Sequence, residues 1–229
     1  MSDFIKFEDS LIKFLKQLER NNDREWFAKN KPRYEEDVLF PALAFVEAFA
    51  PALKKISPHF RAVPKRVGGS VMRVYRDTRF SKDKTPYKTN VGIHFRHEMG
   101  KDVHCPGFYL HIAPKECFAG AGIWHPDSKS LAKIREAIDD RPAEWKRARD
   151  NKKFKSTFEL TGNSLKRHPR GYDPEHKYIV DLKRKDHMGI KSLTAKAITS
   201  KSIIADLKEA FASSKPYMRF LCNALHIPF

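Results

Sequence analysis

The spacing of apolar residues changes once along this chain, from a helical period to a strand period, and this change constrains its fold. In residues 4–18, Phe and Leu recur every three or four positions, which is the pattern of an amphipathic helix. From residue 67 onward, short β-branched and aromatic runs are separated by Gly, Pro, Asn, Asp or Lys, and such close spacing favours antiparallel strands. We therefore expect a helical beginning followed by an antiparallel sheet.

The sequence predicts further elements on both sides of this change. Asp23 is expected to cap a second helix, and Pro41 to bend or divide a third one that runs to residue 53. Strands are predicted at 71–75, 91–95, 108–112, 118–123 and 178–182, with a hairpin between 112 and 118. Helices are predicted after Asp127, from Pro142, and over 203–225, in one piece or broken at Pro216.

These elements predict an α+β fold, in which a mainly antiparallel sheet of about four or more strands is packed by N- and C-terminal helices. A chain of 229 residues with 41% hydrophobic content can bury a substantial core. We expect a single domain over 1–229, with a helical part at 1–60, a sheet meander at 67–124 and a helical, basic part at 127–229.

The excess positive charge is confined to two segments. The formal net charge is +17, enough to attract polyanions. Residues 61–101 carry 11 basic and 3 acidic side chains, and residues 146–196 carry 15 and 6. If the two segments meet they form one basic face; if not, each forms a smaller patch. For the second segment, an ordinary solvated surface is an equal alternative.

The cellular location is predicted from three simple features. Three widely spaced cysteines suggest neither a disulfide framework nor a zinc site. The chain has no apolar run of about 18 residues, and its start lacks the pattern of a signal peptide. We therefore expect a soluble cytoplasmic protein that does not associate with membranes.

Residues 73–90 are the strongest candidate for a binding site. They gather six cations, two acids, three aromatic rings and several hydroxyls at a predicted strand and turn. Arg, Lys and hydroxyl side chains, together with backbone N–H groups, suit phosphate or carboxylate oxygens. The alternative is that Arg73, Arg76 and Asp77 form structural ion pairs and the lysines only keep the loop soluble. The predicted ligand-binding residues of this motif are Arg73, Tyr75, Arg76, Arg79, Lys82, Lys84, Tyr87 and Lys88.

Two further stretches are expected to support this site. Tyr109 and His111 alternate with apolar residues and should leave the sheet on one face. The second basic stretch contributes Lys166, Arg167 and Tyr172, in a loop that could close over a phosphate or remain an exposed turn.

Catalysis has only weak support in the sequence. His111, Asp77 and His125 are the candidates for moving a proton, with His111 and Asp77 expected near the basic turn. No pair of residues has a diagnostic metal-ligand spacing, and no motif predicts a metal or another cofactor.

Three functions are compatible with these observations. The first is binding of a phosphate-bearing ligand or nucleic acid through the basic strand and turn, with tyrosines as stacking surfaces. The second is an enzyme acting on a phosphorylated or otherwise anionic substrate, and the third is a scaffold that binds an acidic protein partner. A concave pocket with convergent Arg, His and Tyr would favour the enzyme, whereas a flat basic surface would favour nucleic acid.

Four motifs, taken together, resemble a known family. They are F-L-x-x-L-x-x-N-N-x-R-x-W-F at 14–27, R-D-x-R-F-S-K-D-K-x-P-Y-K at 76–88, G-F-Y at 107–109 and K-R-x-P-x-G-Y at 166–172. In this order they are similar to the uncharacterised microbial proteins grouped as domain of unknown function 2461. The resemblance implies a cytoplasmic single-domain protein, and it supplies no activity, cofactor or catalytic residue.

Overall fold

The N-terminal quarter of the protein is helical, as the apolar period predicts. The computed structural model describes residues 4–100 and 104–229. Helix α1 (Asp9–Arg20) buries its apolar stripe, and Asp23 caps α2 (Arg24–Tyr34) by accepting a hydrogen bond from the Trp26 N–H at 2.8 Å. A π-helical turn, η1 (Glu35–Leu39), connects α2 to α3 (Phe40–Ile56). Pro41 therefore lies at the start of α3, and the chain stays helical up to it.

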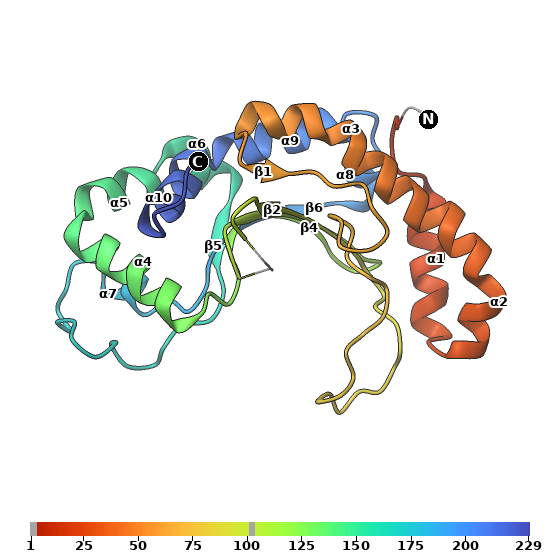
Figure 1. The fold of residues 1–229 in the computed structure, drawn as a ribbon, viewed down its shortest axis with the longest axis horizontal. Coiled ribbons are helices and arrows are strands. Elements are labelled where there is room, and N and C mark those ends of the chain that lie inside the picture. Colours follow the sequence, from red (N-terminus) through yellow and green to blue (C-terminus); the bar gives the residue numbers. More distant parts are fainter. Residues whose placement is uncertain (1–3, 101–103) are drawn as a thin grey trace.

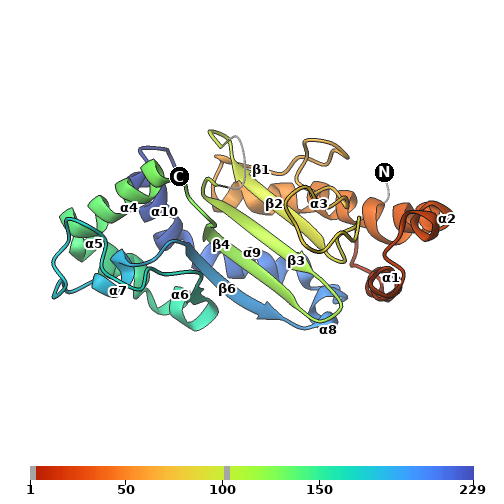
Figure 2. The same cartoon turned by 90° about the horizontal axis from the view of Figure 1, so that it is seen from below.

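A six-stranded antiparallel sheet forms the centre of the molecule (Figures 1 and 2). Its spatial order is β1-β2-β3-β4-β6-β5. The strands are β1 (Phe60–Arg61), β2 (Val91–His97), β3 (Gly107–Ile112), β4 (Cys117–Ile123), β5 (Glu159–Thr161) and β6 (His187–Leu193). A tight hairpin joins β3 to β4, with the Ala113 N–H bonded to the Glu116 carbonyl. The predicted α+β class with a mainly antiparallel sheet is confirmed.

One face of the sheet is covered by helices, and the main core lies there. Helices α3 and α9 (Ile203–Ser213) lie over this face in Figure 1, and the short helix α8 (Ala195–Ile198) directly precedes α9 in the chain. Phe49 of α3 and Phe211 of α9 have ring centroids 5.9 Å apart, and they contact Phe95 and Phe108 of the sheet at 5.1 and 4.9 Å. These buried rings fix the helical layer on the sheet. In residues 4–100 and 104–229, no such layer lies over the other face of the bowed sheet (Figure 1).

The segment between β4 and β6, here called the connecting lobe (residues 124–186), folds beside the sheet. It contains α4 (Ser128–Asp140), α5 (Pro142–Arg149), α6 (Lys152–Thr157), β5 and α7 (Ile179–Leu182), and α10 (Lys215–Ala224) packs against it (Figure 1). The predicted starts of α4 and α5 are confirmed: Asp127 caps α4, and Pro142 begins α5. The C-terminal helix is divided at Ser214, so α9 and α10 are separate.

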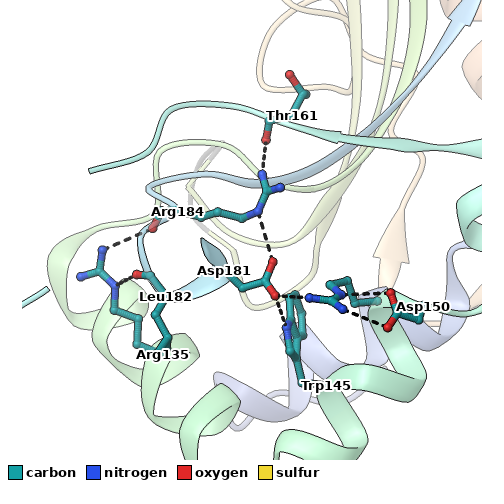
Figure 3. A network of polar contacts seen from close by, with 8 residues as sticks. Arg135, Trp145, Asp150, Thr161, Asp181, Leu182 and Arg184 are labelled. Atoms are coloured by element: carbon teal, nitrogen blue, oxygen red, sulfur yellow. Dashed lines mark hydrogen bonds and ion pairs between the residues drawn. The ribbon is translucent and has the colours of Figure 1, made fainter. Parts of the chain in front are cut away.

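A buried carboxylate ties this lobe together (Figure 3). Asp181 of α7 accepts hydrogen bonds from the Trp145 indole N–H at 2.9 Å and from Arg149, both on α5. Arg184 lies 3.5 Å from the second carboxylate oxygen. Because the Asp181 side chain is only 4% exposed, its charge is compensated by these cations rather than by water.

Two strand predictions were wrong. Residues 71–75 form only isolated bridges, from Val71 to Ile93 and from Tyr75 to Tyr87. The chain pairs with β2 up to Met72 and then turns away to pair with residues 86–88. Neither pairing is long enough to form a continuous strand over 71–75. The run at 178–182 forms helix α7 after its N-cap residue Tyr178, and the buried residues of this stretch are Tyr178, Asp181 and Leu182.

Strand β6 was not predicted from the sequence. Its sequence, H-M-G-I-K-S-L, has few strong strand formers, yet it pairs with β4 along its full length. Pairing with β4 in the sheet outweighs the weak intrinsic strand preference of these residues. Over the residues that the structure describes, no helix is long and apolar enough to cross a membrane.

Candidate functional site

The uncovered face of the sheet is hollowed by glycines. Directly paired residues of antiparallel strands share a face, and the register pairs Gly92 with His111, Tyr109 with Gly120, and Gly107 with Gly122. Three strands therefore place four glycines on the same face as Tyr109 and His111. The alternation predicted for Tyr109 and His111 is present, with their ring centroids 6.0 Å apart.

Two of these glycines are needed because rings of the neighbouring strand lie over them. A Cβ atom at position 92 would stand 2.6 Å from the Tyr109 hydroxyl, and one at position 107 would stand 2.2 Å from His94 Nε2. The absence of side chains at these positions lets the Tyr109 and His94 rings lie across the sheet.

The hollow forms a cavity of about 620 Å³, here called the concave pocket. Its lining combines a few polar groups with apolar side chains and glycines. The lining residues are Met72, Lys88, Asn90, His94, Gly107, Tyr109, His111, Phe118, Gly120, Gly122, Trp124, Thr161, Gly162, Met188 and Ile190. A cavity with mainly apolar walls and a few convergent polar groups is the usual form of a small-molecule site.

Lys88 provides a positive charge in this pocket. It is half-buried, and among the described residues no carboxylate lies within ion-pair distance of its amine. Burial, together with the nearby positive charge of Arg73, lowers the pKa of Lys88. An anion bound beside the amine would offset both effects.

Tyr109, His111 and Asn90 add neutral hydrogen-bonding groups. Burial lowers the pKa of His111 and raises the pKa of Tyr109 to about 12, so both are uncharged at pH 7. The Tyr109 hydroxyl and the Asn90 amide nitrogen lie 3.2 and 3.5 Å from His111 Nδ1. If both donate, Nδ1 accepts and the proton sits on Nε2, which becomes a donor for a ligand. The His111 ring is stacked on Phe118 at 4.7 Å.

The rest of the predicted motif lies in the basic loop (residues 76–86), which projects beside the concave face (Figure 1). Most of its charged side chains form ion pairs or hydrogen bonds with other residues of the loop. Arg76 binds Asp83 and Thr85, Arg79 binds Asp77 at 2.7 Å, and the Lys84 amine donates to the Thr78 carbonyl at 2.9 Å. The ion pairing that was the alternative interpretation of this motif is thus present for Arg76, but for Asp77 the partner is Arg79.

The α1–α2 connection holds the end of this loop. The Asn22 side chain accepts from the Tyr87 N–H at 3.0 Å and donates to the Tyr87 carbonyl at 2.9 Å. The Tyr87 ring is buried and stacked on Phe27 at 4.0 Å. A second cavity of about 670 Å³, the loop cavity, lies here and is lined by Asn22, Asp23, Arg24, Tyr75, Arg76, Thr78, Lys84, Thr85, Pro86 and Tyr87.

Exposed lysines of the basic loop are expected to contribute little to folding. The double substitution Lys82→Ala with Lys84→Ala should change the free energy of unfolding by no more than about 1 kcal/mol, because exposed charges contribute little to stability. Chemical denaturation of both proteins measures this change. A variant that fails to fold would instead assign these cations a structural role.

The predicted site residues are therefore divided among different places. Lys88, Tyr109 and His111 meet in the concave pocket, whereas Tyr75, Arg76, Lys84 and Tyr87 line the loop cavity. Arg73, Arg79 and Lys82 are exposed. Lys166 and Arg167 are exposed on the connecting lobe, where Tyr172 is half-buried, and this lobe and the basic loop lie on opposite sides of the concave face (Figures 1 and 2).

The three residues predicted to move protons also differ in their surroundings. His111 lines the concave pocket, but Asp77 is exposed, binds Arg79 and lines neither cavity. His125 follows the lining residue Trp124 and contacts the buried carboxylate of Asp186 at 3.0 Å. In residues 4–100 and 104–229, no group of three or more His, Cys, Asp or Glu side chains is placed to hold a metal ion.

Asn90, His94 and the common face of the four glycines were not predicted from the sequence, although Gly120 and Gly122 suggested a bulge or the close approach of a ligand or backbone. Glycines at 92, 107, 120 and 122 were a visible signal, but their common face depends on the register of three strands. A shift of one residue would have placed them on the other face.

The geometry defines an α+β protein with a cavity on the uncovered face of its sheet. Residues 10–220 match the family described as "Conserved hypothetical protein (DUF2461)". The chain therefore belongs to this family, as its motifs indicated. No curated protein and no solved structure matches it.

Proposed function

We propose that the protein binds a small phosphate-bearing ligand with a planar ring in the concave pocket. The observation that carries this proposal is the half-buried amine of Lys88, which lies in a cavity without an acidic partner among the described residues. A buried charge is costly unless it is paired. A bound phosphate would supply the missing negative charge.

The other lining residues suit both the phosphate group and the planar ring of such a ligand. Tyr109, Asn90 and His111 offer neutral donors beside the cation, and hydrogen bonds to a charged group contribute about 1.5–3 kcal/mol each. Phe118, together with the apolar wall described above, suits a flat apolar body. A concave pocket with His and Tyr, rather than a flat basic surface, also favours a small ligand over nucleic acid.

The loop cavity fits this role less well. Arg76 is bound to Asp83, and the Lys84 amine is bound to a backbone carbonyl. An incoming anion would have to compete with these contacts, whereas at Lys88 it would displace no carboxylate.

Lys88→Met is expected to weaken phosphate binding roughly 10–100-fold, because it removes one charged contact of about 1.5–3 kcal/mol. Thermal shifts with phenyl phosphate, adenosine monophosphate and inorganic phosphate measure binding. Adenosine, which has no phosphate, tests whether binding requires the negative charge of the ligand. A ligand at a hundredfold excess over its Kd stabilises by about 2.7 kcal/mol. Lys84→Met is the matched control and should keep the full shift.

The unliganded variant provides a second measurement. Because none of the described carboxylates pairs with Lys88, Lys88→Met should be no less stable than the parent protein in the absence of ligand. The proposal fails if none of the phosphates binds the parent, or if Lys88→Met binds them as well as the parent does. Loss of the shift in Lys84→Met alone would place the site in the loop cavity.

A further inference from the structure

Lys88 lies at one end of the concave pocket, beside the start of β2. Its backbone N–H donates to the Val74 carbonyl at 2.7 Å, and the Met72 N–H donates to the Gly92 carbonyl of β2 at 2.8 Å. Met72 and Lys88 both line the pocket. Because Gly92 is paired with His111, Lys88 is placed at the end of the floor that also holds His111.

The surroundings of the Lys88 amine favour its neutral form. Burial and the positive charge of Arg73 both lower the pKa of Lys88, and no carboxylate opposes this effect. A lysine that is desolvated in an apolar pocket, or that lies next to another cation, is the kind that attacks carbonyl compounds. Lys88 meets both conditions.

A hydrogen-bond donor for a carbonyl oxygen lies at the same end of the floor. A Cβ atom at position 92 would stand 2.6 Å from the Tyr109 hydroxyl and 3.0 Å from the Met72 sulfur, so this hydroxyl lies beside the segment that leads to Lys88. The hydroxyl is 3.2 Å from His111 Nδ1. When Tyr109 donates to Nδ1, the proton of the ring sits on Nε2, which can donate to a ligand. Tyr109 is thus a positioning residue for the His111 ring.

We propose that Lys88 is a nucleophile that forms an imine with the carbonyl group of an aldehyde or ketone whose remaining part is apolar. This activity goes beyond phosphate binding and does not depend on it. The neutral amine attacks a carbonyl carbon, whereas the ammonium ion binds an anion, so the two kinds of ligand exclude each other. Phe118 and Met72 suit the apolar part of the ligand, and exclusion of water protects an imine from hydrolysis.

The step is the condensation of an amine with a carbonyl group. The lone pair of Lys88 Nζ forms the N–C bond, and the π electron pair of the carbonyl moves to its oxygen. The Nε2 N–H of His111 stabilises the charge that develops there. One proton passes from Nζ to this oxygen and gives a carbinolamine. The C–O bond then breaks, the nitrogen lone pair forms the C=N bond, and the oxygen takes the second proton of Nζ and leaves as water.

The test is reductive labelling of the full chain at pH 7 with benzaldehyde and sodium cyanoborohydride, which reduces an imine to a stable secondary amine. Peptide mapping by mass spectrometry then gives the rate at each lysine. We expect Lys88 to be labelled at least about tenfold faster than Lys82, which is exposed on the basic loop, because an amine with a lowered pKa is more often neutral. Labelling of Lys88 no faster than that of Lys82 would overturn the inference.

His111→Phe tests the donor. It removes the Nε2 N–H but keeps a ring beside Phe118, on which His111 is stacked. The labelling of Lys88 should slow at least about tenfold in this variant. Full labelling in His111→Phe would show that His111 takes no part in the step.

Lys88→Arg separates this inference from the proposed function. Arginine keeps the positive charge but stays protonated, so the variant should lose the fast adduct in the intact mass and still give a thermal shift with phenyl phosphate. Lys82→Arg is the matched control and should keep the fast adduct. Phosphate binding without preferential labelling of Lys88 would overturn the imine and leave the proposed function intact. Preferential labelling that saturating phenyl phosphate does not slow would support the imine and contradict phosphate binding at Lys88.

Discussion

Asp181→Ala is expected to lower the free energy of unfolding by about 3–5 kcal/mol, because it removes the buried acceptor of the network and leaves the largely buried Arg184 without a carboxylate. Arg149 and the Trp145 indole N–H would lose their shared acceptor, and Arg184 would lose its counter-ion (Figure 3). Urea denaturation followed by far-ultraviolet circular dichroism measures the change.

Asp150→Ala is the matched control for this experiment. Asp150 binds the same arginine through two contacts, at 3.1 and 2.9 Å, but its side chain is 30% exposed. Its removal should cost no more than about 1 kcal/mol, because water replaces the lost contacts. Equal losses in the two variants would mean that burial does not set the contribution of this network.

Gly122→Ala is expected to destabilise the sheet by about 2–5 kcal/mol, through strained backbone and overpacking. Gly122 has φ of 140°, and a Cβ atom there would stand 2.0 Å from the backbone oxygen of His187. That oxygen belongs to the paired strand β6, so it cannot move without disturbing the ladder. Thermal and chemical unfolding of the variant measure the loss.

Gly120→Ala separates this strain from the general effect of adding a methyl group. A Cβ atom at position 120 would stand 3.2 Å from the end of the flexible Met188 side chain, which can shift. We expect a change of less than about 1 kcal/mol. If Gly120→Ala were as damaging as Gly122→Ala, the close backbone approach of β4 and β6 would not explain the glycine at 122.

The sequence predicted the parts of the fold that depend on local signals. Asp23 was recognised as a cap from its place before an apolar run, the start of α4 was placed at Asp127 or Ser128, and β2, β3 and β4 were recognised from their strand period. Strand β6 was missed, because Met, Gly, Lys and Ser have weak local preferences and its pairing with β4 is set by tertiary structure. The run at 178–182 was misjudged because β-branched residues also occur in short helices that bury one side.

The candidate site was only partly predictable for a similar reason. Tyr109 and His111 could be placed on one face by alternation alone, and Lys88 was selected for its charge. The separation of Lys88 from Arg76 and Lys84 into different cavities could not be foreseen, because it depends on how Asn22 holds the Tyr87 backbone. The contact between His125 and Asp186 joins residues 61 positions apart, and no sequence spacing indicates it.

The floor of the concave pocket and the wall that the connecting lobe contributes differ in how much change in sequence length they can tolerate. Strands β2, β3 and β4 form the floor, and β3 is paired along its full length with β2 on one side and with β4 on the other. Residues 124–186 leave the sheet after β4 and return to it at β6, and doubling the length of such a loop costs only about 0.6 kcal/mol of closure free energy. Insertions in this lobe can therefore reshape the far wall of the concave pocket while the glycine floor and its rings stay constant.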